Sequence, residues 1–127
     1  MSVQILDREL VRLEGLWSDG LAESYRAYLE SVHRFDADTQ PRLALAAALI
    51  EAGIRLQGLG GPAAPPTTLL IGDLCLARGS RLLADSAPLE VQVAFARAIE
   101  TFASAAASQR PAPDARRMLS DALGARP

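Results

Sequence analysis

The stretch from Arg42 to Gln57 most constrains the fold, because it is apolar on almost every face of a helix. After Arg42 it reads LALAAALIEAGIRLQ, in which alanine and leucine, two strong helix formers, predominate. A helix that is apolar all round has to be covered by its neighbours. Its longest apolar run, Leu43 to Ile50, is far shorter than the ~18 residues that a membrane span requires. We therefore expect a central, buried helix and no transmembrane segment.

Two further helices are predicted before this stretch, because apolar residues recur there at helical spacing. The first stripe consists of Leu6, Leu10, Leu13 and Trp17. The second stripe consists of Leu21, Tyr25, Tyr28 and Val32, and its helix is expected to end near Phe35. Pro41 suits the first turn of the central helix, and Asp38 or Thr39 can cap it.

The strongest break in the chain is the connector from Gly58 to Pro66, where glycine and proline are too dense for a helix. We expect a fourth helix from Thr67 or Thr68 to about Ala84, and a fifth after Pro88. The stripe of the fifth helix consists of Val91, Phe95, Ile99, Phe102 and Ala106. Asp114 can cap a short last helix. No strand-like alternation occurs, so we predict an all-α fold of about six helices in a bundle.

Composition limits the classes of function that the chain can have. The net charge of −2 does not favour binding to nucleic acid or to an anionic membrane surface. Charged residues come too early at the N-terminus for a secretory signal, so we expect a cytoplasmic protein. All thirteen basic residues are arginine, which excludes catalysis by a lysine base or Schiff base. The single histidine argues against a zinc site built on several imidazoles.

No local group of residues has the pattern of a catalytic or metal site. Asp36 and Asp38 form the one local carboxylate pair, but they stand at a helix start, where capping explains them better than a metal ion. His33 is expected in the last turn of the preceding helix, which favours a partly charged imidazole. Cys75 lies on an apolar helix, so we expect a buried and inert thiol. We predict no catalytic residue, no cofactor and no metal site in this chain.

The predicted fourth helix, TTLLIGDLCLARGSRLLADSA, combines a small-residue face with a single aspartate. The residues of that face are Gly72, Leu76, Gly79, Ser80 and Leu83. Because several are small, another helix can approach closely there. Asp73 is expected in the first turn, where the helix N-terminus stabilises its charge. From these properties alone, a tightly packed core helix is favoured over a catalytic aspartate.

The segment from Leu69 to Gly79, followed by Leu82 and Leu83, resembles the "LxGDyLlaRa…ll" helix of trans-isoprenyl diphosphate synthases. Phe95 to Ala103 is similar to the next helix of that family, and Asp38 to Gln57 to the helix before it. The resemblance covers about Asp38 to Ala107. It implies a fold like the first half of such a synthase. The chain would then be a single domain, residues 1–127, with a helical pair in 1–37, synthase-like helices in 38–109 and a short helix or tail in 110–127.

The chain departs from the catalytic members of this family. Those members carry a DDxxD motif between the two helices, where this chain has Leu59, Gly60, Gly61 and Pro62. They also carry a second aspartate-rich motif and diphosphate-binding lysines in a second half. Diphosphate ionisation requires Mg²⁺ held by clustered carboxylates, together with cationic groups. We therefore expect no prenyl transfer by this chain alone, and Mg²⁺ only in a catalytic partner.

A short chain of this kind resembles the small, non-catalytic subunit of two-component hexaprenyl and heptaprenyl diphosphate synthases. That resemblance implies a catalytic partner that contains DDxxD, and a role in making the menaquinone side chain. In the resembled synthases the fourth and fifth helices lie at the dimer interface. The corresponding interface residues here are Leu70, Asp73, Leu74, Leu76, Gly79, Ser80, Leu83, Phe95, Ile99 and Phe102.

The same helices predict a homodimer when the chain is alone, because they are apolar on more than one face. Two alternatives remain open at this stage. One is a stand-alone homodimeric helical interaction protein without a synthase role. The other is a small enzyme or lipid-binding protein that uses an apolar cavity between helices.

Overall fold

The computed structural model describes residue 15 and residues 20–57 and 66–127. The described part contains five α-helices and no strand, in agreement with the predicted all-α class. They are listed in chain order: α2 (Ala22–Leu29), α3 (Thr39–Leu56), α4 (Pro66–Ser86), α5 (Leu89–Ala107) and α6 (Ala115–Leu123). The predicted helix with Leu6, Leu10, Leu13 and Trp17 lies outside the described residues, as does most of the Gly58–Pro66 connector. None of these five helices is long and apolar enough to cross a membrane.

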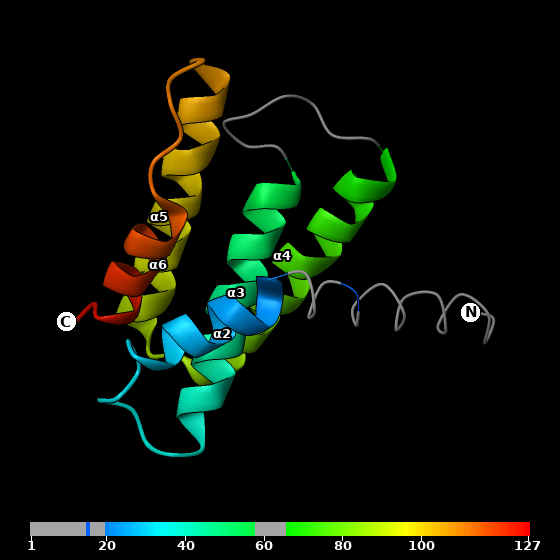
Figure 1. The fold of residues 1–127 in the computed structure, drawn as a ribbon. Helices are drawn as coiled ribbons and strands as arrows, with labels where there is room; N and C mark the ends of the chain where they lie inside the picture. Colours follow the sequence, from blue (N-terminus) through cyan, green and yellow to red (C-terminus); the bar gives the residue numbers. More distant parts are fainter. Residues whose placement is uncertain (1–14, 16–19, 58–65) are drawn as a thin grey trace.

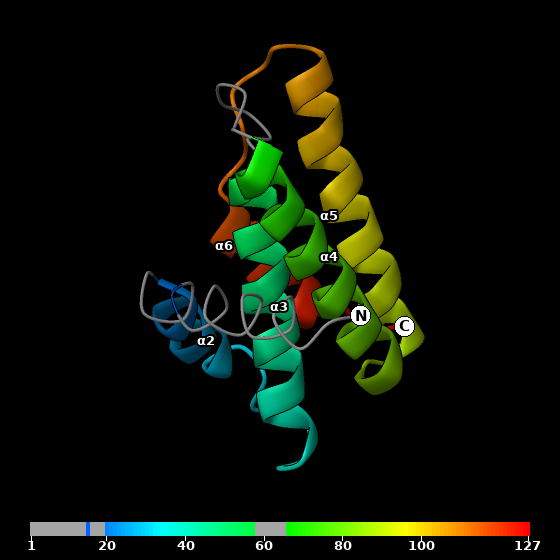
Figure 2. The ribbon, with the colours of Figure 1, turned by 90° about the vertical axis from the view of Figure 1, so that its right-hand side faces the viewer.

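The central position predicted for the apolar stretch is confirmed. Every residue of α3 from Leu43 to Ile54 is buried except Leu45, which is half-buried against the core. Helix α4 packs along α3, α2 lies across it, and α6 lies beside both α3 and α5 (Figure 1). Seen from the side, α3 stands among the other helices, with α2 and α4 on different sides of it (Figure 2). The apolar character of α3 is thus explained by neighbours that cover it on several sides.

Helices α3 and α4 approach closely because glycine stands where they cross. A Cβ atom added to Gly79 would lie 2.8 Å from Cγ1 of Ile50 and 3.0 Å from the carbonyl oxygen of Ala46. A Cβ atom added to Gly53 would lie 3.0 Å from the carbonyl oxygen of Gly72. These distances are shorter than ordinary van der Waals contact between carbon atoms. The small residues of α4 therefore allow backbone-to-backbone packing within the chain.

The helix predicted from Leu21 to near Phe35 is shorter than expected. It ends at Leu29, and Glu30, Ser31 and Val32 each donate a backbone hydrogen bond to the residue three positions earlier. These tight turns keep Val32 fully buried while the chain bends towards α3. The prediction that His33 occupies the last turn of a helix is therefore wrong. It lies in a turn, exposed, with Nε2 3.6 Å from Oε2 of Glu30.

The cap predicted for α6 is confirmed, whereas the prediction that Asp38 or Thr39 caps α3 is wrong. Before α3, Oδ1 of Asp36, rather than Asp38, accepts a hydrogen bond from the backbone N–H of Thr39 at 2.9 Å. A hydrogen bond from the Thr39 side chain, and then this one from its backbone, lower the pKa of the Asp36 carboxyl. Before α6, Oδ1 of Asp114 accepts from the backbone N–H of Arg117 at 3.2 Å, as expected. Both carboxylates thus satisfy backbone donors that a helix start leaves free.

Candidate functional site: a buried polar cluster between α2, α3 and α6

Glu51 is the one charged side chain that is buried in the described part of the chain. It lies in the middle of α3, where its neighbours on the helix are apolar, and only 8% of it is exposed. A buried carboxylate is costly unless donors satisfy its oxygens. The residues that satisfy Glu51 therefore define the most unusual chemical environment in this fold.

Two hydroxyl groups of α2 donate to Glu51. The Tyr28 hydroxyl donates to Oε1 at 2.9 Å, and the Ser24 hydroxyl donates to Oε2. Tyr28 is fully buried and Ser24 is 2% exposed. The two residues are four positions apart, so they lie on the same face of α2 and reach the same carboxylate. This face also carries the buried apolar Leu21, which places the polar pair beside the core.

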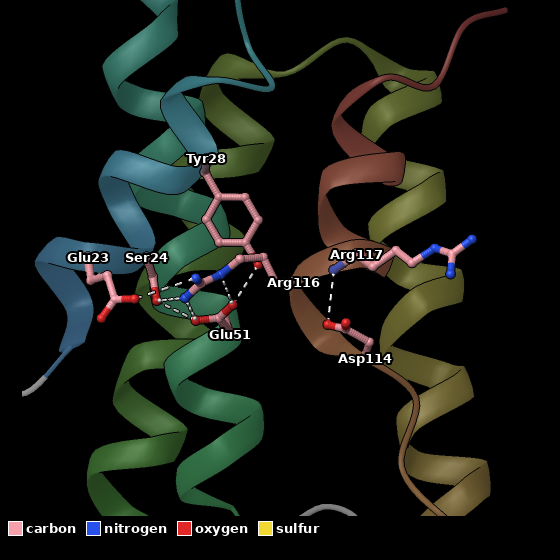
Figure 3. Close-up of polar contacts among 7 residues, drawn as sticks. All are labelled: Glu23, Ser24, Tyr28, Glu51, Asp114, Arg116 and Arg117. Carbon is pink, nitrogen blue, oxygen red and sulfur yellow. Dashed lines mark hydrogen bonds and ion pairs between the residues drawn. The ribbon is translucent and has the colours of Figure 1, made fainter.

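Arg116 completes the cluster from α6 (Figure 3). Its Nε donates to Oε1 of Glu51 at 3.2 Å, and its Nη2 donates to Oε2 of Glu51 at 3.3 Å and to the Ser24 hydroxyl at 2.8 Å. Its Nη1 lies 3.9 Å from Oε1 of Glu23, which is exposed. The guanidinium thus makes a bidentate contact with one buried carboxylate and links three helices through it.

The electrostatics of the cluster keep Glu51 ionised. Burial raises the pKa of the Glu51 carboxyl, but hydrogen bonds from Arg116, Ser24 and Tyr28 outweigh burial, so its pKa lies below the usual value. Burial raises the pKa of the Tyr28 hydroxyl, and the charge of Glu51 raises it further. The hydrogen bond to Glu51 also raises the pKa of Arg116. Tyr28 is therefore a fixed donor, and Glu51 and Arg116 form an ion pair at neutral pH.

The start of α6 positions Arg116. Asp114 caps the helix, and Arg116 stands in its first turn, facing α3. The other end of α6 is held by Arg34, whose Nη2 donates to the carbonyl oxygens of Leu123 at 3.0 Å and Ala125 at 2.7 Å. The last carbonyl groups of a helix have no N–H donor within the helix, so the Arg34 guanidinium satisfies these two at the end of α6.

A cleft of about 510 Å³ opens beside the cluster, at the start of α6. Its lining residues are Glu51, Ile54, Arg55, Phe102, Ala112, Pro113, Asp114, Ala115 and Arg116. The lining is mixed, because it contains apolar side chains, two arginines and two carboxylates. The cleft therefore lies next to the first turn of α6 and to the polar cluster.

The arrangement is suited to holding helices together. Each oxygen of Glu51 accepts from at least two donor atoms, so the carboxylate is satisfied by the protein itself. The Tyr28 hydroxyl is directed at Glu51 and is fully buried. Among the described residues, no group of three or more His, Cys, Asp or Glu side chains could hold a metal ion. Cys75 is fully buried, as predicted, and burial raises the pKa of its thiol.

The residues predicted at an interface differ in where the structure places them. Buried within the chain are Gly79, Leu83, Phe95 and Phe102. Half-buried are Leu74, Leu76 and Ile99. Exposed are Leu70, Asp73 and Ser80, and Leu70 is 63% exposed. The contact of these ten residues with a partner stays a prediction. The three exposed residues all lie on α4, where a partner could reach them directly.

Asp73 has a different environment from the one predicted. Because α4 begins at Pro66, Asp73 stands about two turns into the helix, and placing it in the first turn was wrong. The stabilising effect of a helix N-terminus falls off within the first turn. Instead, Oδ1 of Asp73 accepts a hydrogen bond from Nε2 of Gln57, which also donates to the carbonyl oxygen of Leu69 at 3.1 Å. Asp73 thus ties α4 to the end of α3.

The sequence did not lead to a prediction of the buried polar cluster around Glu51. Glu51 was included in a helix described as apolar almost all round, and Arg116 was given no role. One signal was present: a single carboxylate inside a long apolar run has to find donors when the helix is buried. The donors could not be identified, because Ser24 and Arg116 are separated by 92 positions in the chain.

Searches against known protein families, curated proteins and solved structures found no match for this chain. The assignment of a function therefore depends on the residues described above and on the resemblance of the α4 segment.

Proposed function

We propose that this chain is a non-catalytic subunit that supports a long-chain trans-prenyl diphosphate synthase through contacts between helices. The observation that carries the proposal is the placement of the LLIGDLCLARG segment in α4. Its Gly72 and Gly79 face α3 within the chain, whereas Leu70 and Ser80 are exposed. The segment that resembles a synthase helix thus has one face in the core and one face open to a partner.

The chemistry of the chain supports a role without catalysis. The sequence has no aspartate-rich motif between α3 and α4 and no lysine. Glu51, the one buried carboxylate among the described residues, is engaged by Arg116, Ser24 and Tyr28. Prenyl transfer requires carboxylates that are free to hold Mg²⁺ near a diphosphate. We infer that Mg²⁺ and both aspartate-rich motifs belong to the partner, and that the product is the side chain of menaquinone.

The proposal is tested by co-expressing the tagged chain with the DDxxD-containing synthase of the same organism. We expect the two chains to purify together and prenyl chain elongation to require both. Ser80→Arg should weaken the complex about tenfold or more, because a bulky cation would stand on the exposed face of α4.

Ser108→Arg is the matched control, because Ser108 is also exposed but lies at the C-terminal end of α5. It should leave the complex unchanged. If the two chains do not associate, and the synthase elongates prenyl chains equally well alone, the subunit role is wrong. A stable homodimer under those conditions would instead favour a stand-alone interaction protein.

A further inference from the structure

Helix α6 is shorter than every other described helix except α2. It has only nine residues, and a helix of this length is not stable alone in water. Its apolar face is buried through Leu119, Ala122 and Leu123. The segment that connects it to α5, residues 108–114, is largely exposed and contains Pro111 and Pro113. Its first residues, Ser108 to Arg110, donate hydrogen bonds back to the end of α5, and residues 111–113 then lead to α6.

Both ends of α6 are tied to the first half of the chain by arginines. Arg116 joins the first turn to Glu51 and Ser24, and Arg34 holds the last carbonyls through Leu123 and Ala125. These are hydrogen bonds to charged groups, which are stronger than those between neutral groups. They are also few, so the loss of one changes the attachment of the whole helix.

An open cleft of about 510 Å³ lies at the first turn of α6. Residues 112–116 line it together with Ile54 and Phe102, which are only 3% and 2% exposed. The ion pair of Arg116 and Glu51 forms part of the lining of this cleft. By contrast, the crossing of α3 and α4 leaves no room for an added Cβ atom. Regions with fewer buried apolar contacts open at lower free energy than the core.

We propose that α6 is a latched strap, which opens as a unit while α3 and α4 remain folded, and that the contact between Arg116 and Glu51 is its latch. Opening removes Arg116 from the buried carboxylate and uncovers the apolar surface around Ile54 and Phe102. The strap therefore controls access to the junction of α3 and α5. This motion is independent of the subunit role proposed above.

Hydrogen exchange of backbone amides on the full chain tests the strap. In the wild type, amides of residues 119–123 should exchange faster than those of residues 46–54 in α3. Glu51→Gln should speed exchange in α6 by about tenfold or more, because it removes the charge that the guanidinium contacts. Amides in α3 and α4 should change much less. Glu100→Gln, at an exposed position on α5, is the matched control and should have no effect on α6.

Equal acceleration in α3, α4 and α6 would show that only global unfolding occurs and would overturn the proposal. So would α6 amides as protected as those of α3 in the wild type. If Glu51→Gln does not fold, as judged by circular dichroism, Arg34→Gln replaces it, because it releases the other end of the strap. That variant should also accelerate exchange in α6 alone, and failure to do so would again overturn the proposal.

Limited digestion with trypsin provides a second measurement. Arg116 and Arg117 stand in the first turn of α6, whereas Arg55 and Arg78 lie in α3 and α4. If the strap opens as a unit, Glu51→Gln should be cleaved first after Arg116 and Arg117. Simultaneous cleavage in α3 and α4 would contradict the independent motion of α6.

Discussion

The crossing of α3 and α4 and the junction of α2, α3 and α6 are held by different forces. At the crossing, glycines allow two backbones to touch, and no charged side chain is buried there. At the junction, a buried carboxylate gathers donors from two other helices, beside an open cleft. The comparison indicates that shape fixes the first contact, whereas a small number of polar groups fixes the second.

This difference determines how each region should respond to substitution. Close-packed crossings fail when volume is added, because neither backbone can move without disturbing the rest of the core. Polar junctions fail when one partner is removed, because the remaining groups are left buried and unsatisfied. Added volume at the crossing should therefore cost more stability than the loss of one polar partner at the junction.

Gly79→Leu should have the largest effect, a loss of about 3 kcal/mol or more in the free energy of unfolding. The first added atom already lies 2.8 Å from Ile50 and 3.0 Å from the carbonyl oxygen of Ala46. Urea denaturation measures the change. The neighbouring Ser80→Leu is the control, because Ser80 is exposed and should tolerate the same side chain within about 0.5 kcal/mol. Equal losses in the two variants would contradict close packing at Gly79.

Glu51→Ala should destabilise the protein by about 2–4 kcal/mol, because Arg116 loses its buried partner and Ser24 and Tyr28 lose their acceptor. Thermal and urea unfolding would both report this loss. Glu100→Ala, at an exposed site on α5, should change stability by less than about 0.5 kcal/mol. A loss at Glu51 as small as that at Glu100 would show that the cluster does not hold the junction.

Asp114→Ala should cost about 1 kcal/mol, because it removes the acceptor for the backbone N–H of Arg117 at the start of α6. Hydrogen exchange should place the effect in α6. Asp121→Ala, an exposed position later in the same helix, is the control and should have little effect. If both variants behave alike, the cap does not define the start of this helix.

The smallest expected effect concerns pH. The folded-state pKa of Glu51 lies below its usual 4.5, so the ionised carboxylate contributes stability that is fully present above that value. This contribution is lost as the pH falls through the folded-state pKa, because the unfolded state then binds more protons. Glu51→Gln should therefore lose less stability than the wild type between about pH 7 and pH 3.

Asp36, whose pKa is also lowered, is present in both proteins and cancels in this comparison. Urea midpoints across the pH range provide the measurement. Parallel curves for wild type and Glu51→Gln would mean that Glu51 does not titrate within this window.

Much of the fold could be predicted from local pattern. The apolar run after Arg42 required burial on all sides, and the structure buries nearly all of it. Asp114 gave the start of the last helix, and Cys75 was expected to be buried. The end of α2 could not be predicted, because the stripe continues to Val32 although the helix stops at Leu29. The spacing of apolar residues indicates which side chains are buried. Because tight turns can bury a side chain as well as a helix does, this spacing does not show where the helix ends.

The candidate site was less predictable for a physical reason. Helical propensity and capping depend on residues within one or two turns, so the sequence by itself determined that the five described helices form and which one is central. It also determined the absence of an aspartate-rich motif between α3 and α4. The glycines of α4 predicted a close contact with another helix, but they did not indicate which helix it would be. Only the tertiary structure decided that Gly79 meets Ala46 and Ile50, and that Glu51 receives Arg116 from 65 positions away. A buried charge requires a partner, and the tertiary fold of the whole chain decides which residue becomes that partner.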